Sequence, residues 1–292
     1  MSFAVEVEKL TYEFSNGSKP SLVDIDLQIP WNTRTLIVGA NGAGKSTLLK
    51  VLSGKHLCRD GKILVNGLNP FSPAATVSPE DGCLVTTYLG TEWCHMSVIN
   101  RDIGVSELLE SIGLAHFQER GDLLCKMLDV DLKWRMFRLS DGQKRRVQLV
   151  MGLLKPWKVL LLDEVTVDLD VIARSRLLQF LKWETQTREC SVMYATHIFD
   201  GLAEWPDQLL HLKDGRIVDR LDLRKNVQFT DSANGDGAGN GTVTFTPPAG
   251  DHDRPLVSIT KVESLHPLAV AWLSQDPNEL KQMSPTPQPT LR

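Results

Sequence analysis

GANGAGKST, residues 39–47, is the stretch of this sequence that decides the fold. The short apolar run TLIVG at 35–39 leads into it, and STLLKVLSG at 46–54 follows it with helical spacing and a glycine stop. Glycines allow the backbone between such a strand and helix to curl, so that successive N–H groups point at one anion. A chance glycine turn would not need this context, and the strand–loop–helix order therefore predicts a phosphate-binding loop.

The loop predicts a site for ATP with Mg²⁺. We expect Lys45 to reach the β- and γ-phosphates and to take part in catalysis, Ser46 to supply a hydroxyl to Mg²⁺, and Thr47 to add a phosphate contact. The residues expected to bind the nucleotide are Gly39, Ala40, Asn41, Gly42, Ala43, Gly44, Lys45, Ser46 and Thr47.

A second apolar strand, VLLLDE at 159–164, delivers two carboxylates to its carboxyl end. We expect Asp163 to hold Mg²⁺ and Glu164 to orient and deprotonate an attacking water. Either acid alone could merely cap a strand or a helix. The pair, in a chain that also carries the glycine loop, indicates a catalytic role.

His197 ends another strand-like segment, SVMYATH at 191–197. A lone histidine is more often structural than functional, and by itself it would favour that interpretation. Because the neighbouring strand ends carry phosphate chemistry, we expect His197 to make a polar contact to the γ-phosphate.

LSDGQKRR at 139–146 is a second polar loop that contains glycine, and it opens directly onto the helical run VQLVMGLL. Such a loop aims the N-terminus of a helix at an anion. The chain therefore has two loops suited to phosphate, and they are far apart in the sequence.

Buried strands that alternate with helices along the chain predict an α/β fold. LLHLKDGRIVDRL at 209–221 reads as a β-hairpin. The expected divisions are an α/β domain at 1–222 with a helical insertion at 91–158, a flexible Gly- and Asn-rich linker at 223–255, and a tail at 256–292 with one short helix and a largely disordered end.

The composition excludes several classes of protein. The net charge is −4, which argues against direct nucleic-acid binding by a broad basic surface. The five cysteines are odd in number and form no Cys-x-x-Cys pair, as is typical of free thiols in a reducing compartment. No apolar run reaches the roughly 18 residues of a membrane span, and the N-terminus does not read as a signal peptide. We expect a soluble cytoplasmic protein that could also enter the nucleus.

The order of these motifs over residues 3–220 resembles the ATP-binding-cassette (ABC) ATPase family. In that family the 39–47 loop is the Walker A motif, LSDGQ at 139–143 is the signature, and 159–164 is the Walker B motif. The resemblance implies a P-loop NTPase core with an N-terminal antiparallel β subdomain and a helical signature subdomain. It also implies a dimer, expected to be a homodimer, in which the signature of one protomer closes over the nucleotide held by the other.

Further residues are assigned by this resemblance. Ser140, Gly142 and Gln143 are implied to contact the partner's nucleotide, and an aromatic near the N-terminus usually stacks on adenine. Phe14 fits that place best, with Tyr12 as the alternative and an ordinary strand side chain as a third interpretation.

The sequence departs from the family pattern at three places. Asp141 stands where many members have a second glycine, and VTVDLD at 165–170 replaces the usual Pro-Thr-Ser-Gly-Leu-Asp. In the transporters of the family a glutamine between these motifs helps to couple the nucleotide to the membrane subunits, and here it is missing. The sole glutamine between the Walker A loop and the signature is Gln118, which lies in a segment with a helical pattern. Glu92 or a neighbour could act near Mg²⁺ in place of the missing glutamine.

TYLGTEW, RLSDGQKRRVQL and YATHIFDGLAEWPDQ are similar to a soluble eukaryotic subgroup of single-cassette ABC ATPases without membrane segments. This subgroup includes a fungal member associated with the Ccr4–Not transcription and mRNA-decay complex, and the resemblance implies a regulatory protein complex such as Ccr4–Not as partner. Two alternatives stay open. The chain could be the nucleotide-binding subunit of a transporter with separate membrane subunits, or an ATP-dependent interaction module with little hydrolysis.

Overall fold

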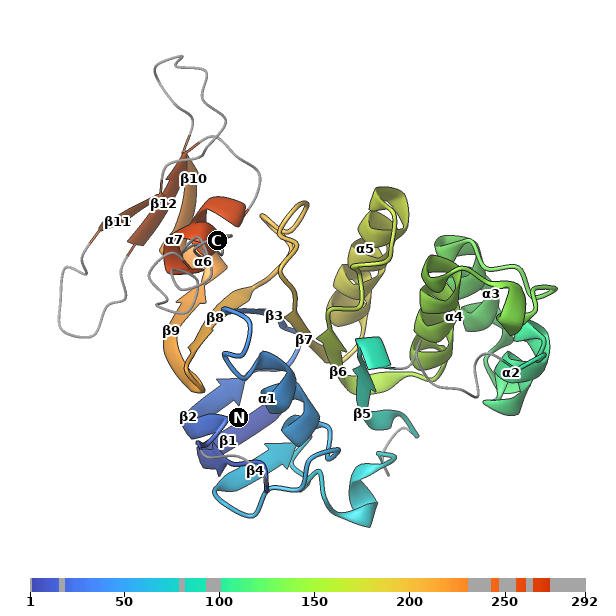
Figure 1. The fold of residues 1–292 in the computed structure, drawn as a ribbon, viewed down its shortest axis with the longest axis horizontal. Coiled ribbons are helices and arrows are strands. Elements are labelled where there is room, and N and C mark those ends of the chain that lie inside the picture. The colour runs from blue at the N-terminus through green and yellow to red at the C-terminus, as the bar shows by residue number, and fades with distance from the viewer. Residues whose placement is uncertain are drawn as a thin grey trace, which may run out of the picture.

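The computed structural model describes residues 2–15, 19–78, 82–92, 101–230, 243–246, 256–260 and 265–273. Figure 1 shows an N-terminal β part beside a central sheet, a group of helices to one side, and a small C-terminal sheet on the other.

The central sheet has six strands in the order β5-β6-β7-β3-β8-β9. Its neighbouring strands are parallel except for β8 and β9, which form the hairpin predicted around Lys213 to Gly215. The strands are β3 (Arg34–Val38), β5 (Leu84–Leu89), β6 (Trp157–Asp163), β7 (Ser191–Ala195), β8 (Gln208–Lys213) and β9 (Arg216–Asp222). The parallel arrangement brings the carboxyl ends of β3, β6 and β7 to one edge of the sheet.

Helices cover both faces of this sheet. Every residue of β3, β6 and β7 is buried, as expected for parallel strands that are covered on both faces. Val159 and Leu161 of β6 belong to the same core as α1 (Lys45–Leu52), whereas Leu160 belongs to the core that contains α4 (Asp141–Leu154) and α5 (Val171–Thr187). Successive residues of each strand therefore point into different cores, which is why the apolar run in the sequence of the strand is uninterrupted.

A second, antiparallel sheet lies at the N-terminal end, in the order β2-β1-β4. Its strands are β1 (Val5–Tyr12), β2 (Leu22–Ile29) and β4 (Lys62–Val65). The buried residues Val5, Val7 and Leu10 of β1 join the α1 core. The predicted antiparallel β subdomain is confirmed.

The helical part consists of α2 (Val105–Ser111), α3 (Gln118–Leu128) and α4, all within the range expected for the insertion. A buried ion pair joins it to the rest of the molecule. Arg120 of α3 donates from Nη1 and Nη2 to the two carboxylate oxygens of Glu184 in α5, each at 2.8 Å. The Glu184 side chain has no solvent exposure, so α3 and α5 share one desolvated charge pair.

The C-terminal part differs from the sequence expectation of a flexible linker at 223–255. Within that range the structure forms α6 (Leu223–Asn226), β10 (Val227–Thr230) and β11 (Val243–Thr246), and β10 and β11 flank β12 (Leu256–Thr260). Four-residue strands beside Gly-rich text are too short for alternation to be recognised. The Gly-rich stretch 231–242 and the end after 273 lie outside the described residues.

The expected short helix is α7 (His266–Leu273). Its Trp272 stacks on the His211 ring of β8, with centroids 4.7 Å apart and planes 8° apart. The C-terminal part is therefore packed against the central sheet at β8.

Candidate functional site

The 39–47 loop connects β3 to α1, as the sequence predicts. Gly44 adopts φ 102°, and a Cβ there would lie 2.8 Å from the Ser21 carbonyl oxygen, so this position requires glycine. Asn41 and Gly42 are exposed at the tip of the loop, while Ala40 and Ala43 are buried.

Lys45 is buried at the start of α1 and folds back over the loop. Its Nζ donates to the carbonyl oxygens of Gly39 at 2.7 Å and Ala40 at 3.0 Å. Burial lowers the pKa of Lys45, and the nearby carboxylates of Glu164 and Asp163 oppose that shift. The ammonium group thus lies among main-chain acceptors and two acids, in a place that a phosphate oxygen could share.

Ser46 and Asp163 meet across the gap between α1 and β6. Ser46 Oγ donates to Asp163 Oδ1 at 3.0 Å, so the hydroxyl and the carboxylate expected to bind the metal are neighbours. Mg²⁺ takes oxygen ligands, often one or two from protein with the rest from water and substrate phosphates, and this donor set fits it. Thr47, expected to contact phosphate, accepts a hydrogen bond from Ser21 Oγ at 3.1 Å.

Tyr88 is a further contact of Asp163 that the sequence did not indicate. Its phenol donates to Asp163 Oδ2 at 2.9 Å. Burial, followed by the negative charge of Asp163, raises the pKa of Tyr88, so the phenol keeps its proton and remains a donor. The pairing of β5 with β6 brings the two residues together, and that pairing cannot be read from either strand alone.

Glu164 and His197 form a pair at the ends of β6 and β7. His197 Nδ1 lies 2.9 Å from Glu164 Oε2, and the main-chain N–H of Glu164 donates to the Ala195 carbonyl at 3.0 Å. Glu164 adopts φ 55°, a left-handed conformation that is uncommon for a residue with a side chain. The structure thus brings together the acid and the histidine that the sequence assigned separately.

The signature residues form the N-terminus of α4. Ser140 caps the helix by accepting from Gln143 N at 3.3 Å, and Gln143 Oε1 accepts from Ser140 N at 3.0 Å. A Cβ on Gly142 would lie 2.9 Å from the Asp168 carbonyl oxygen, so the loop after Glu164 passes directly against the signature. Within the described part of the chain, no hydrogen bond joins these residues to the 39–47 loop.

Phe14, the expected adenine platform, lies in a small aromatic group beyond the end of β1. It is 41% exposed and meets the rings of Tyr12 and His56 edge-on, at centroid distances of 5.1 and 5.4 Å. Tyr12 is held in place, because its hydroxyl lies 3.1 Å from His56 Nδ1. Phe14 therefore has the more available ring of the two candidates.

Comparison with known proteins agrees with this geometry. The family model described as ABC transporter matches residues 22–167, which is half of the chain. CCR4-associated factor 16 of Saccharomyces cerevisiae is 66% identical over 282 residues, covering 94% of this chain and 95% of the relative. This chain belongs to the ABC family.

Other members of the family extend the comparison. ABC transporter I family member 21 of Arabidopsis thaliana is 42% identical, covering 77% of this chain and 81% of that protein. The dimeric structure of MJ0796, a bacterial ABC transporter cassette, has the same fold, with a TM-score of 0.62 and 19% identity over 75% of this chain and 99% of that one. The ABC-type α/β fold is therefore confirmed.

The ABC cassette departs from the family pattern after β5, where the usual glutamine is missing. Gln118 lies in α3 and donates to Asp122 at 2.9 Å, far along the chain from the Walker motifs. Glu92, considered as a substitute near Mg²⁺, forms an ion pair with Lys50 instead. In the described part of the chain after the Walker A loop, the side chain that hydrogen-bonds the Asp163 carboxylate is that of Tyr88.

No helix in the described part of the ABC cassette combines the length and apolar character needed to cross a bilayer.

Proposed function

We propose that this ABC cassette binds ATP with Mg²⁺ and hydrolyses it. The observation that carries the proposal is the convergence of three pairs or groups at one sheet edge. These are Lys45 in its loop, Ser46 beside Asp163, and Glu164 beside His197. Together they supply a cation for the phosphates, oxygen ligands for the metal and a base for water, which are the parts that phosphoryl transfer requires.

Each group has a role that follows from its chemistry. Lys45 exchanges its main-chain acceptors for phosphate oxygens, and Ser46 and Asp163 hold Mg²⁺, which neutralises charge on the phosphates when bound. Glu164 accepts the proton of the attacking water. His197 contacts the Glu164 carboxylate and would orient it, and we expect the histidine to make a polar contact to the γ-phosphate as well.

The second part of the proposal is a nucleotide-driven homodimer. Ser140, Gly142 and Gln143 form a capped helix N-terminus that makes no hydrogen bond to the described 39–47 loop of its own chain. A helix N-terminus is a ready anion site, so we infer that it closes over the γ-phosphate bound by a second protomer. ATP then acts as a ligand of the interface, and its hydrolysis loosens the dimer.

A Glu164→Gln variant tests both parts. It should bind ATP, hydrolyse it at least about 100-fold more slowly because the base is lost, and accumulate as a dimer in size-exclusion chromatography with Mg²⁺ and ATP. Glu189→Gln is the matched control, since Glu189 is an exposed acid that pairs with Lys158 outside the site. A Glu164→Gln chain that stays monomeric with saturating ATP would refute the dimer, and one that hydrolyses ATP normally would refute the base.

The biological role we propose is regulation of a transcription- or mRNA-related protein complex such as Ccr4–Not, in the cytoplasm and also in the nucleus. The 66% identical relative carries the name CCR4-associated factor 16, which supports this choice over a transporter subunit. Affinity purification with the Glu164→Gln trap, and with Lys45→Ala as the variant that cannot hold ATP, tests the role. Transcription or mRNA-decay factors among the ATP-dependent partners would support it. Integral membrane proteins would favour the transporter alternative.

A further inference from the structure

Both carboxylate oxygens of Asp163 are held by side chains from other elements. Ser46 Oγ of α1 donates to Oδ1 at 3.0 Å, and the Tyr88 phenol of β5 donates to Oδ2 at 2.9 Å. A hydroxyl that gives a lone pair to a metal keeps its proton, so Ser46 still donates to Oδ1 when its oxygen is a metal ligand. The Tyr88 phenol is the second donor within the described chain, and it holds the oxygen that Ser46 does not, so the two donors together fix the plane of the carboxylate.

The position of the Tyr88 ring is itself constrained by a glycine. A Cβ on Gly90 would lie 2.6 Å from the Tyr88 hydroxyl oxygen, so the phenol reaches Asp163 only because residue 90 has no side chain. The Gly90 carbonyl accepts from Arg145 Nη1 and from Gln148 Nε2, each at 2.9 Å. Helix α4, which carries the signature, thus anchors the segment on which Tyr88 depends.

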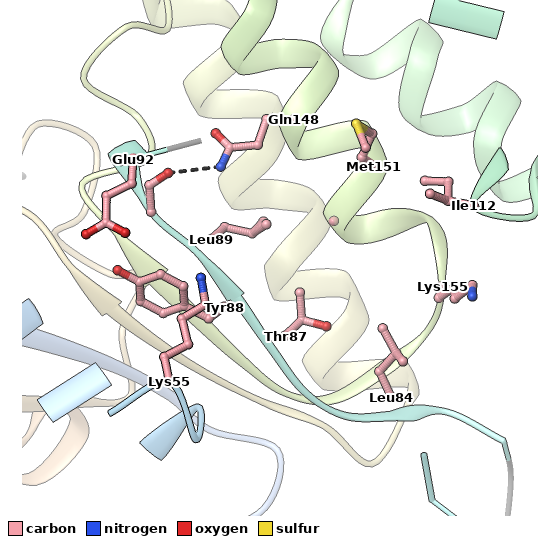
Figure 2. A pocket seen from close by; sticks show the side chains of 12 residues that line it. Lys55, Leu84, Thr87, Tyr88, Leu89, Glu92, Ile112, Gln148, Met151 and Lys155 are labelled. Carbon is pink, nitrogen blue, oxygen red and sulfur yellow. Dashed lines mark hydrogen bonds between the residues drawn. The ribbon is translucent and has the colours of Figure 1, made fainter. Parts of the chain in front are cut away.

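Tyr88 also lines a groove of about 520 Å³ between β5 and α4. Figure 2 shows its ring at the wall of the groove with Lys55 beside it, and Gln148 and Met151 across from it on α4. Lys55 Nζ lies 4.4 Å from the centre of the Tyr88 ring, in cation–π contact. The phenol is therefore packed from the groove side while its hydroxyl points to the metal-binding carboxylate.

We propose that Tyr88 is a positioning residue for Asp163, placed there by Gly90 and α4, so that the metal site of this cassette depends on a side chain of the groove wall. The inference rests on the proposed ATP and Mg²⁺ site and adds to it a second group that orients the Asp163 carboxylate. Partners that orient a metal ligand by hydrogen bonding are typically worth about 10- to 100-fold in metal affinity or activity.

Nucleotide binding to the full chain with Mg²⁺ titrated tests the proposal without relying on turnover. A fluorescent ATP analogue is bound first in EDTA and then at rising Mg²⁺. In Tyr88→Phe the affinity in EDTA should equal that of the wild type, while the Mg²⁺ concentration for half-maximal gain should rise about tenfold. Where hydrolysis is measured, the Mg²⁺ dependence of the rate should shift by the same factor, with the maximal rate partly restored at high Mg²⁺.

Thr87→Val is the matched control. Thr87 is the neighbouring residue of β5 and lines the same groove, and its buried hydroxyl has no hydrogen-bond partner in the described chain. This variant should keep the wild-type Mg²⁺ dependence. Gly90→Ala should reproduce the shift of Tyr88→Phe, because its methyl group displaces the phenol.

An unchanged Mg²⁺ dependence in Tyr88→Phe would overturn the proposal, as would an equal shift in Thr87→Val. A shift in Gly90→Ala without one in Tyr88→Phe would show that the segment matters and the hydroxyl does not, which also overturns it. A wild-type chain that binds the analogue without hydrolysing ATP would refute the proposed hydrolysis alone, since the Mg²⁺ titration still reports on Tyr88.

Discussion

The ion pair between Arg120 and Glu184 should be a principal determinant of stability. Arg120→Met removes two hydrogen bonds to a fully buried carboxylate and a third, from Arg120 Nε to the Leu153 carbonyl at 2.8 Å. It also removes the guanidinium from its place 5.3 Å from the Phe180 ring centre. Breaking a buried pair by removing one partner costs about 3–5 kcal/mol, because the other charge stays in the interior.

One remaining contact reduces the expected loss of stability in Arg120→Met. Glu184 keeps a second guanidinium, that of Arg188, which donates from Nε at 3.0 Å. We therefore expect Arg120→Met to lower the free energy of unfolding by about 3 kcal/mol, at the low end of the usual range. Replacing both residues, in Arg120→Met with Glu184→Met, should recover a large part of the loss, since no carboxylate is then left without its partner.

Urea denaturation followed by circular dichroism measures these differences. Lys62→Met is the control, because Lys62 also pairs with two carboxylates, Glu6 at 2.8 Å and Glu8 at 2.9 Å, but on the exposed edge of the N-terminal sheet. An exposed pair contributes about 0–1 kcal/mol. A loss below about 1 kcal/mol in Arg120→Met, equal to that of the control, would refute the reasoning.

The same pair predicts a dependence on pH. Burial raises the pKa of Glu184, but the hydrogen bonds from Arg120 and Arg188 outweigh it, and the pKa in the folded protein is lowered from its ordinary value of 4.5. A lowered pKa means that the stabilisation is complete above pH 4.5 and is lost as the pH falls through the folded-state pKa. The stability difference between wild type and Glu184→Gln should therefore be constant at neutral pH and shrink below pH 4.5. A difference that grows on acidification would contradict this sign.

Three further predictions concern the nucleotide site. Ser140→Arg should lower hydrolysis at least about 100-fold while the monomer still binds ATP, because the larger side chain blocks the hydrogen-bond donors at the N-terminus of α4. Steady-state turnover at the normal rate would exclude the signature assignment. Phe14→Ala should weaken ATP binding by about 1–2 kcal/mol if the exposed ring stacks on adenine, and an unchanged Kd by fluorescence titration would leave Phe14 an ordinary surface residue. Gly44→Ala should abolish tight ATP binding, because the new Cβ would lie 2.8 Å from the Ser21 carbonyl oxygen and a φ of 102° is strained for alanine. ATP binding equal to wild type in calorimetry would contradict this.

The sequence predicts those parts of the fold in which local pattern and tertiary environment agree. The strands before Gly39 and at 157–163 are apolar at most positions because both of their faces are buried. Loop chemistry is equally local, so the place of Lys45 at the start of α1 follows from its neighbours in the chain. Four-residue strands such as β10 and β11 carry too few residues for their pattern to stand out, so the sequence predicts a linker in a range where the structure also has two short strands.

The candidate site divides in the same way. Ser46, Asp163, Glu164 and His197 could be predicted because each lies within two residues of the end of an element with a recognisable pattern. Tyr88 carries no such pattern, since a tyrosine within TTYL is an ordinary strand residue. Its contact with Asp163 depends on which strand β5 pairs with and on the absence of a side chain at residue 90.

The N-terminus of α4 carries several hydrogen-bond donors suited to the anion that we propose it binds. Ser140 uses its oxygen as an acceptor for Gln143 N, and a hydroxyl that accepts one hydrogen bond still has its proton to donate. Gln143 likewise accepts through Oε1 and keeps both N–H donors of its amide. No described residue accepts from the main-chain N–H groups of Asp141 and Gly142, the first two of α4.

These donors all belong to one helix end, so the capping that stabilises α4 also orients them. The exposed Asp141 carboxylate interacts favourably with the positive end of the helix dipole. In the proposed dimer it would repel the γ-phosphate, so its side chain would have to point away from the nucleotide. Hydrolysis by an Asp141→Gly variant should therefore equal or exceed that of the wild type at low ATP, because repulsion is removed while Ser140 and Gln143 keep their donors. A loss of dimerisation in that variant would instead give the carboxylate a direct role at the interface.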